Sequence, residues 1–93
     1  MPDYTKDKIA GCYVYFTSDC VVEAFHAHAD PKRSKRTAAR LYIRADGSVH
    51  IGTQGRLTDF QLREVIKYIR RNYKDMYAKW LSKGGTPGYY ERY

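Results

Sequence analysis

The feature that most constrains this chain is a long amphipathic segment from Leu57 to Gly85. Its apolar side chains recur every three or four residues, which is the spacing of one helical face: Leu62, Val65, Ile66, Ile69, Tyr73, Met76, Tyr77 and Trp80. Thr58 is a favoured N-cap residue, and Gln61 completes a capping box three positions later. Gly84 and Gly85 mark the end. The sequence therefore predicts a helix of about six and a half turns, roughly 36 Å at 1.5 Å per residue.

The residues before this helix show the period of two that is typical of strands. Residues 9–17 and 21–28 are expected to form two strands joined by a turn at Ser18-Asp19, and Asp30-Pro31 ends the second strand. A third strand alternates between two faces, with Ala39, Leu41 and Ile43 inside and Arg40, Tyr42 and Arg44 outside. Asp46-Gly47 then predicts a hairpin whose returning strand places Val49 and Ile51 inside and Ser48 and His50 outside.

This order of elements predicts an α+β fold, an antiparallel meander of about four strands packed on one long C-terminal α-helix. Residues 9–85 are assigned to this single domain. Residues 1–8 form a polar N-terminal lead-in, and residues 86–93 form a Tyr-rich tail. The tail lacks periodicity, so both a position on the sheet and a free position stay open. The sheet face away from the helix is expected to be open.

Charge is the strongest compositional indication of a partner. The 93 residues carry a formal net charge of +7, and such a surface attracts polyanions over long distances. Nucleic acid is the first candidate and an acidic protein surface the second, while solubility alone is the alternative explanation. No apolar run approaches the length of a membrane span, and the N-terminus lacks the form of a secretory signal. We expect a cytoplasmic protein with reduced cysteines, Cys12 and Cys20, and no membrane partner.

The candidate binding residues fall into three basic groups. The loop from residue 32 to 36 gathers four cations, the open sheet face places arginines on either side of a tyrosine, and the outer helix face carries a ridge of cations. Arginine interleaved with tyrosine suits phosphate contact together with base stacking. The predicted nucleic-acid or partner-binding residues are Lys32, Arg33, Lys35, Arg36, Arg40, Tyr42, Arg44, Arg63, Lys67, Arg70, Arg71 and Lys74.

His26 and His28 are two residues apart on a strand, so both imidazoles are expected on one side of it. Such a pair can supply two metal ligands or act as acid and base on a phosphodiester. No third ligand is recognisable beside them, and no zinc-ribbon spacing, phosphate loop or nucleophile elbow is present in the sequence. We therefore expect a structural pair, with no metal, no cofactor and no catalytic residue.

Several elements together resemble a family of small, mostly bacterial proteins, domain of unknown function number four-one-six-zero. They are His26-Ala27-His28, the Ala-rich strand, Asp46-Gly47, the junction Gly55-Arg56-Leu57-Thr58 and a long helix ending in Lys79-Trp80. The resemblance covers roughly Tyr13 to Gly84. Members are often encoded in toxin–antitoxin-like gene pairs, so the resemblance implies a bacterial or phage setting and a protein partner of that kind.

Three functions follow from these observations as alternatives. The first is a small basic binding module that contacts RNA or DNA without catalysis. The second is a protein-directed inhibitor, antitoxin-like or of the anti-defence (anti-CRISPR-like) type, acting through a surface rich in tyrosine and arginine. The third is a histidine-dependent nuclease toxin. The binding module is the function that we expect from the sequence.

Overall fold

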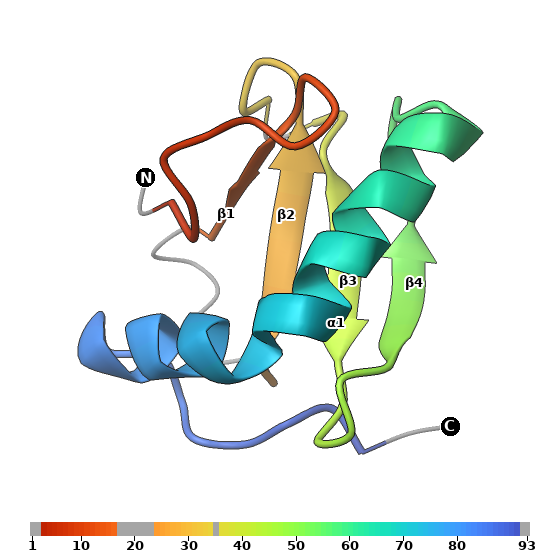
Figure 1. The fold of residues 1–93 in the computed structure, drawn as a ribbon. Helices are drawn as coiled ribbons and strands as arrows, with labels where there is room; N and C mark the ends of the chain where they lie inside the picture. The colour runs from red at the N-terminus through yellow and green to blue at the C-terminus, as the bar shows by residue number, and fades with distance from the viewer. Residues whose placement is uncertain (1–2, 17–23, 35, 92–93) are drawn as a thin grey trace.

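The elements follow the chain in the order that the sequence predicts. The computed structural model describes residues 3–16, 24–34 and 36–91. Within these residues lie β1 (Tyr13–Tyr15), β2 (His26–Asp30), β3 (Ala39–Ile43), β4 (Val49–Thr53) and α1 (Asp59–Ser82). The strands pair antiparallel in the order β1-β2-β3-β4 (Figure 1), which confirms the predicted meander followed by a helix. The predicted turn at Ser18-Asp19 lies outside the described residues.

The turn between β3 and β4 is set by Asp46 and Gly47. Gly47 has a φ of +86°, a conformation that side chains with a Cβ rarely adopt. The Asp46 carboxylate accepts a hydrogen bond from the Ser48 backbone N–H at 2.9 Å. A Cβ on Gly47 would lie 2.7 Å from the Tyr73 ring, so the glycine also lets α1 approach this turn. The hairpin predicted from this pair of residues is confirmed.

The core lies between the sheet and α1. Alternate residues of the central strands are fully buried on the face toward the helix: Ala27, Ala29, Ala39, Leu41 and Ile43. The helix opposes them with a stripe of buried side chains: Leu62, Val65, Ile69, Met76 and Trp80. Ile51 departs from the prediction. It pairs with Leu41 and so shares its face, but it is 43% exposed because β4 is the edge strand.

The start of α1 is fixed by the predicted capping box. The Thr58 hydroxyl accepts from the Gln61 backbone N–H at 3.1 Å, and the Gln61 side chain accepts from the Thr58 N–H at 3.0 Å. The helix ends at Ser82, and Gly84 follows with a φ of +88°. Within the described residues, no helix combines the length and the hydrophobicity that crossing a bilayer requires.

Figure 1 shows that α1 bends part of the way along its length. Its first half crosses the sheet and its second half runs past the end of the sheet. Near the bend, the Asn72 side chain donates to the Tyr68 carbonyl at 2.9 Å, one turn earlier. The second half carries Trp80, whose ring packs edge-on against Phe16 at a centroid distance of 5.4 Å and lies tilted against Phe25 at 5.8 Å. The bend therefore closes the core at one end of the sheet.

Both terminal segments take part in this core. Tyr4, from the predicted polar lead-in, is 1% exposed, and its hydroxyl donates to the His26 carbonyl at 2.9 Å. In the tail, the Tyr90 N–H donates to the Ile43 carbonyl at 2.9 Å. Tyr89 stacks on Tyr77 with ring centroids 4.2 Å apart. Tyr89 and Tyr90 of the tail therefore lie against the end of the sheet, which resolves for these residues the alternative that the sequence left open.

Candidate nucleic-acid interface

The face of the sheet away from α1 gathers histidine, tyrosine and arginine from neighbouring strands. His26 pairs with Tyr42 across β2 and β3, and Tyr42 pairs with His50 across β3 and β4. His28 and Arg40 form the next pair along the same face. Because Ala27 and Leu41 point into the core, these neighbours in the alternation point outward. We call this surface the outer face.

Three rings on the outer face form a continuous group, which we call the platform: Tyr42, His50 and Tyr90. Tyr90 stacks on Tyr42 with centroids 4.8 Å apart and on His50 with centroids 5.0 Å apart. A Cβ at Gly52 would lie 2.9 Å from the Tyr42 ring, so the glycine lets this ring lie close to the β4 backbone. The platform therefore joins β3, β4 and the tail.

Exposure differs across the outer face. His26 and Tyr15 are each 1% exposed. Both lie on the outer face, where Tyr15 is paired with His28 across β1 and β2. Tyr42 and Tyr90 are half-buried, and His50 is exposed. The platform, on the β3–β4 side of the sheet, is therefore accessible, and His28 on β2 is half-buried like Tyr42 and Tyr90.

Two arginines flank the platform, as the alternation of β3 predicts. Arg40 is exposed and Arg44 is half-buried. The Arg44 guanidinium lies 5.8 Å from the centre of the Tyr90 ring and donates to the Ser48 hydroxyl at 3.3 Å. A cation beside an aromatic surface can hold a phosphate while a base stacks on the ring.

The histidine pair shares the outer face, with ring centroids 5.2 Å apart. Nδ1 of His26 lies 2.8 Å from the Ala24 carbonyl oxygen. A carbonyl can only accept, so this nitrogen carries a proton and donates. Among residues 3–16, 24–34 and 36–91, no group of three or more His, Cys, Asp or Glu side chains could hold a metal ion. Asp19 and Cys20, two side chains of metal-ligating type near the pair in the sequence, lie outside these residues.

The basic loop after β2 is organised by Asp30, which is fully buried. Its carboxylate accepts from the Lys32 N–H at 2.8 Å, the Ser34 N–H at 3.0 Å and the Thr37 hydroxyl at 3.2 Å. The Arg56 guanidinium adds two hydrogen bonds, at 2.9 and 2.8 Å. Burial alone would raise the pKa of Asp30, but the hydrogen bonds from Arg56, Ser34 and Lys32 and the charge of Arg56 lower it to about 2.

The predicted cations of this loop are not equivalent. Lys32 and Arg36 are exposed, and Lys35 lies outside the described residues. Arg33 lies 3.9 Å from the centre of the Tyr13 ring, and its Nε donates to Asp3 at 3.2 Å. Arg33 therefore ties the N-terminal segment to β1, which is a structural contact that the sequence pattern does not reveal.

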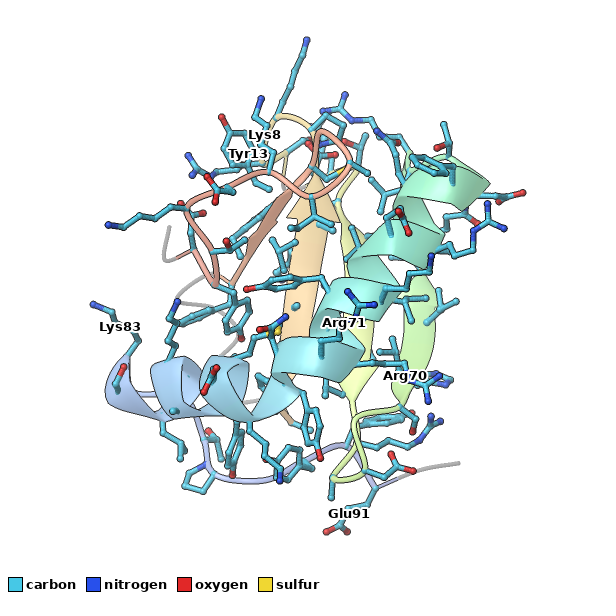
Figure 2. The ribbon with its side chains drawn as sticks, in the orientation of Figure 1. Lys8, Tyr13, Arg70, Arg71, Lys83 and Glu91 are labelled. Atoms are coloured by element: carbon cyan, nitrogen blue, oxygen red, sulfur yellow. The ribbon has the colours of Figure 1, made fainter. Side chains whose placement is uncertain are left out.

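The cations of the helix ridge lie on the other side of the molecule from the platform. Figure 2 shows Arg70 and Arg71 projecting from α1, which covers the inner face of the sheet. The exposed members of this ridge are Arg63, Lys67, Arg70, Arg71 and Lys74. Lys67 pairs with Glu64 at 3.1 Å. The three predicted groups thus form at least two separate surfaces.

Sequence reasoning left three contributors out of its list of site residues. His50 was placed on the outer face by alternation, and its pairing with Tyr42 makes it part of the platform. Tyr90 carries no periodic signal, because its position depends on how the tail packs. Arg56 supports the basic loop by donating hydrogen bonds to Asp30. The two residues are 26 positions apart in the sequence, and only the fold brings them together.

Comparisons with protein-family models, curated proteins and solved structures find no match for this chain. The resemblance to domain of unknown function number four-one-six-zero, and the toxin–antitoxin setting that it implies, stay predictions.

Proposed function

We propose that this chain is a binding module for single-stranded nucleic acid and that it binds on the outer face. The bases stack on the platform, and Arg40 and Arg44 contact the phosphates. The observation that carries the proposal is the group of three neighbouring, partly or fully accessible rings on a sheet face flanked by arginines. The net charge of +7 adds long-range attraction to the same ligand.

The arrangement favours single strands over duplexes. A ring can stack on a base only when that base is free of its own neighbours, as in loops and single strands. Stacking accepts every base, because each has a π-face, so weak sequence selectivity follows. Arginine contacts to phosphate add affinity that falls as the salt concentration rises.

Fluorescence anisotropy with labelled oligouridine, and with a duplex of matched length, tests the proposal. Tyr42→Ala is expected to weaken single-strand binding by about 1–3 kcal/mol through lost stacking. Tyr68→Ala is the matched control, because Tyr68 is a half-buried tyrosine on α1, away from the platform. Thermal melts of both variants separate lost binding from lost folding.

Two results would contradict this function. One is a parent protein that binds neither the single strand nor the duplex at low salt. The other is an equal loss of affinity in Tyr42→Ala and Tyr68→Ala when both variants remain folded, since the platform would then have no special role.

A further inference from the structure

The tail crosses one end of the sheet and places two neighbouring tyrosines on opposite sides of it. Figure 1 shows the tail running from the end of α1 back to the turn between β3 and β4. On the helix side, Tyr89 stacks on Tyr77 with ring centroids 4.2 Å apart. On the outer face, Tyr90 stacks on Tyr42 and His50. Tyr89 therefore anchors the tail to the core, and Tyr90 is the tail residue that reaches the platform.

Tyr90 holds the position over the other two platform rings that a stacked base would take. Tyr42 and His50 are paired across β3 and β4, with ring centroids 6.2 Å apart. Tyr90 lies closer to each of them, at 4.8 and 5.0 Å, and its plane is inclined to theirs by only 29° and 21°. Rings this close and this nearly parallel overlap face to face, as a base does on an aromatic side chain. The aromatic surface that the sheet provides is therefore partly covered by a ring of the same chain.

Tyr42 is also contacted from the side of the sheet. Its ring lies against the β4 backbone at Gly52, where an added Cβ would be 2.9 Å away. The His26 ring lies beside it at a centroid distance of 5.3 Å. Because the sheet contacts the ring on one side and Tyr90 stacks on it, a base that stacks on Tyr42 needs the position of Tyr90.

The contacts of Tyr90 are separate from those that hold the preceding residues of the tail. The Tyr90 N–H donates to the Ile43 carbonyl at 2.9 Å, and its ring contacts are those of the platform. Nearer to α1, the Gly88 carbonyl accepts from the Phe25 N–H at 3.0 Å. Tyr90 can therefore leave the platform by giving up its own hydrogen bond and ring contacts, while Gly88 and Tyr89 stay on the core.

We propose that Tyr90 is an intramolecular competitor of the single strand: a base displaces its ring and stacks on Tyr42 and His50. This inference rests on the proposed function and adds a step to it, because binding requires the tail to open at Tyr90. The affinity of the chain is then lowered in proportion to the small fraction of molecules in which the platform is uncovered. Removing the Tyr90 ring strengthens binding in this case, whereas removing a ring on which bases stack would weaken it.

The test is fluorescence anisotropy of labelled oligouridine with the full chain. Tyr90→Ala is expected to bind about tenfold more tightly than the parent. Gly88→Ala should tighten binding about fivefold, because Gly88 has a φ of +140° and a Cβ there strains the seated tail without removing a ring. Gly11→Ala is the matched control, since Gly11 has a φ of +81° but lies before β1, and it should bind like the parent. Thermal melts show whether each variant is folded.

Amide hydrogen exchange reports the opening directly. In the parent saturated with oligouridine, the Tyr90 amide is expected to exchange about tenfold faster or more, because its hydrogen bond to Ile43 is lost. The Phe25 amide, which donates to Gly88, should keep its protection and is the internal control. This measurement uses the parent, so it decides the question even if Tyr90→Ala does not fold.

Three results would overturn the inference. One is weaker binding by folded Tyr90→Ala while Tyr42→Ala also binds weakly, since the proposed function would then stand with Tyr90 as a base-stacking residue. Another is equal affinity of the parent, Tyr90→Ala and Gly88→Ala. The third is a Tyr90 amide that stays protected in the saturated complex. If folded Tyr42→Ala binds as tightly as the parent, the proposed function itself fails, and the inference fails with it.

Discussion

Asp30 keeps its charge inside the protein because its carboxylate accepts five hydrogen bonds, two of them from the Arg56 guanidinium. Its pKa is lowered from 3.8 to about 2. A lowered carboxylate pKa means that the folded state binds this proton less readily than the unfolded state. The stabilisation is therefore fully present above pH 3.8 and is lost as the pH falls through about 2.

The expected contribution of this ionisation is about 2 kcal/mol in the free energy of unfolding. Urea denaturation at neutral pH and at about pH 2 measures it, and Asp30→Asn should remove this part of the pH dependence. Asp75→Asn is the control, because Asp75 is exposed on α1. If Asp30→Asn retains the full acid sensitivity of the parent, the carboxylate of Asp30 does not carry it.

His26 is the residue that separates a structural role for the histidine pair from a chemical one. It is 1% exposed and its Nδ1 lies 2.8 Å from a carbonyl oxygen. His26→Gln is expected to lower the free energy of unfolding by about 1–3 kcal/mol, the usual effect of disturbing a buried hydrogen bond. The exposed His50 provides the control, His50→Gln, which should unfold like the parent. RNA cleavage by the parent that disappears in a folded His26→Gln variant would show instead that the pair is catalytic.

At the scale of the element, α1 depends on its buried face more than on its cap. Trp80 is fully buried, and its Nε1 donates to the Thr86 carbonyl at 2.9 Å. Trp80→Ala is expected to cost about 3–5 kcal/mol, and Thr58→Ala about 1 kcal/mol through the lost cap. Urea unfolding checks both values, with Leu81→Ala as a control at a neighbouring, 41% exposed position. Equal unfolding of Trp80→Ala and Leu81→Ala would contradict this description of the core.

The elements that could be predicted from the sequence are those whose signals are local. The capping box predicts the start of α1, and Asp46-Gly47 predicts the turn between β3 and β4. The burial of Tyr4 and the position of the tail could not be predicted, because each depends on contacts with residues far away in the chain. The exposure of Ile51 also escaped prediction, since alternation gives the face of a residue but not how far the helix covers the edge strand on that face.

At the scale of the whole molecule, the positive charge is divided between opposite sides of the sheet. Alternation along β3 was enough to place Arg40 and Tyr42 together on the outer face. It could not show that the tail brings Tyr90 onto Tyr42, nor that the helix ridge lies on the other side. A sequence lists cations in order, whereas the fold decides which of them can contact one ligand at the same time.

The last prediction concerns this division of charge. If the outer face binds single strands, the logarithm of the binding constant for oligouridine should fall linearly with the logarithm of the salt concentration. Lys32 and Arg36 are the exposed described cations of the basic loop. A residue whose side chain contacts a phosphate contributes about one to this salt slope, so we expect alanine at either residue to reduce the slope by about one. The affinity should fall by a similar factor for every nucleic-acid sequence.

Lys83→Ala and Lys74→Ala are the matched controls, because both lysines are exposed at α1 rather than on the outer face. Their slopes should equal that of the parent. A reduced slope in the helix variants, with no change in the loop variants, would move the nucleic-acid site to the ridge on α1. The platform would then lose its proposed role, because its rings lie on the opposite side of the sheet from that ridge.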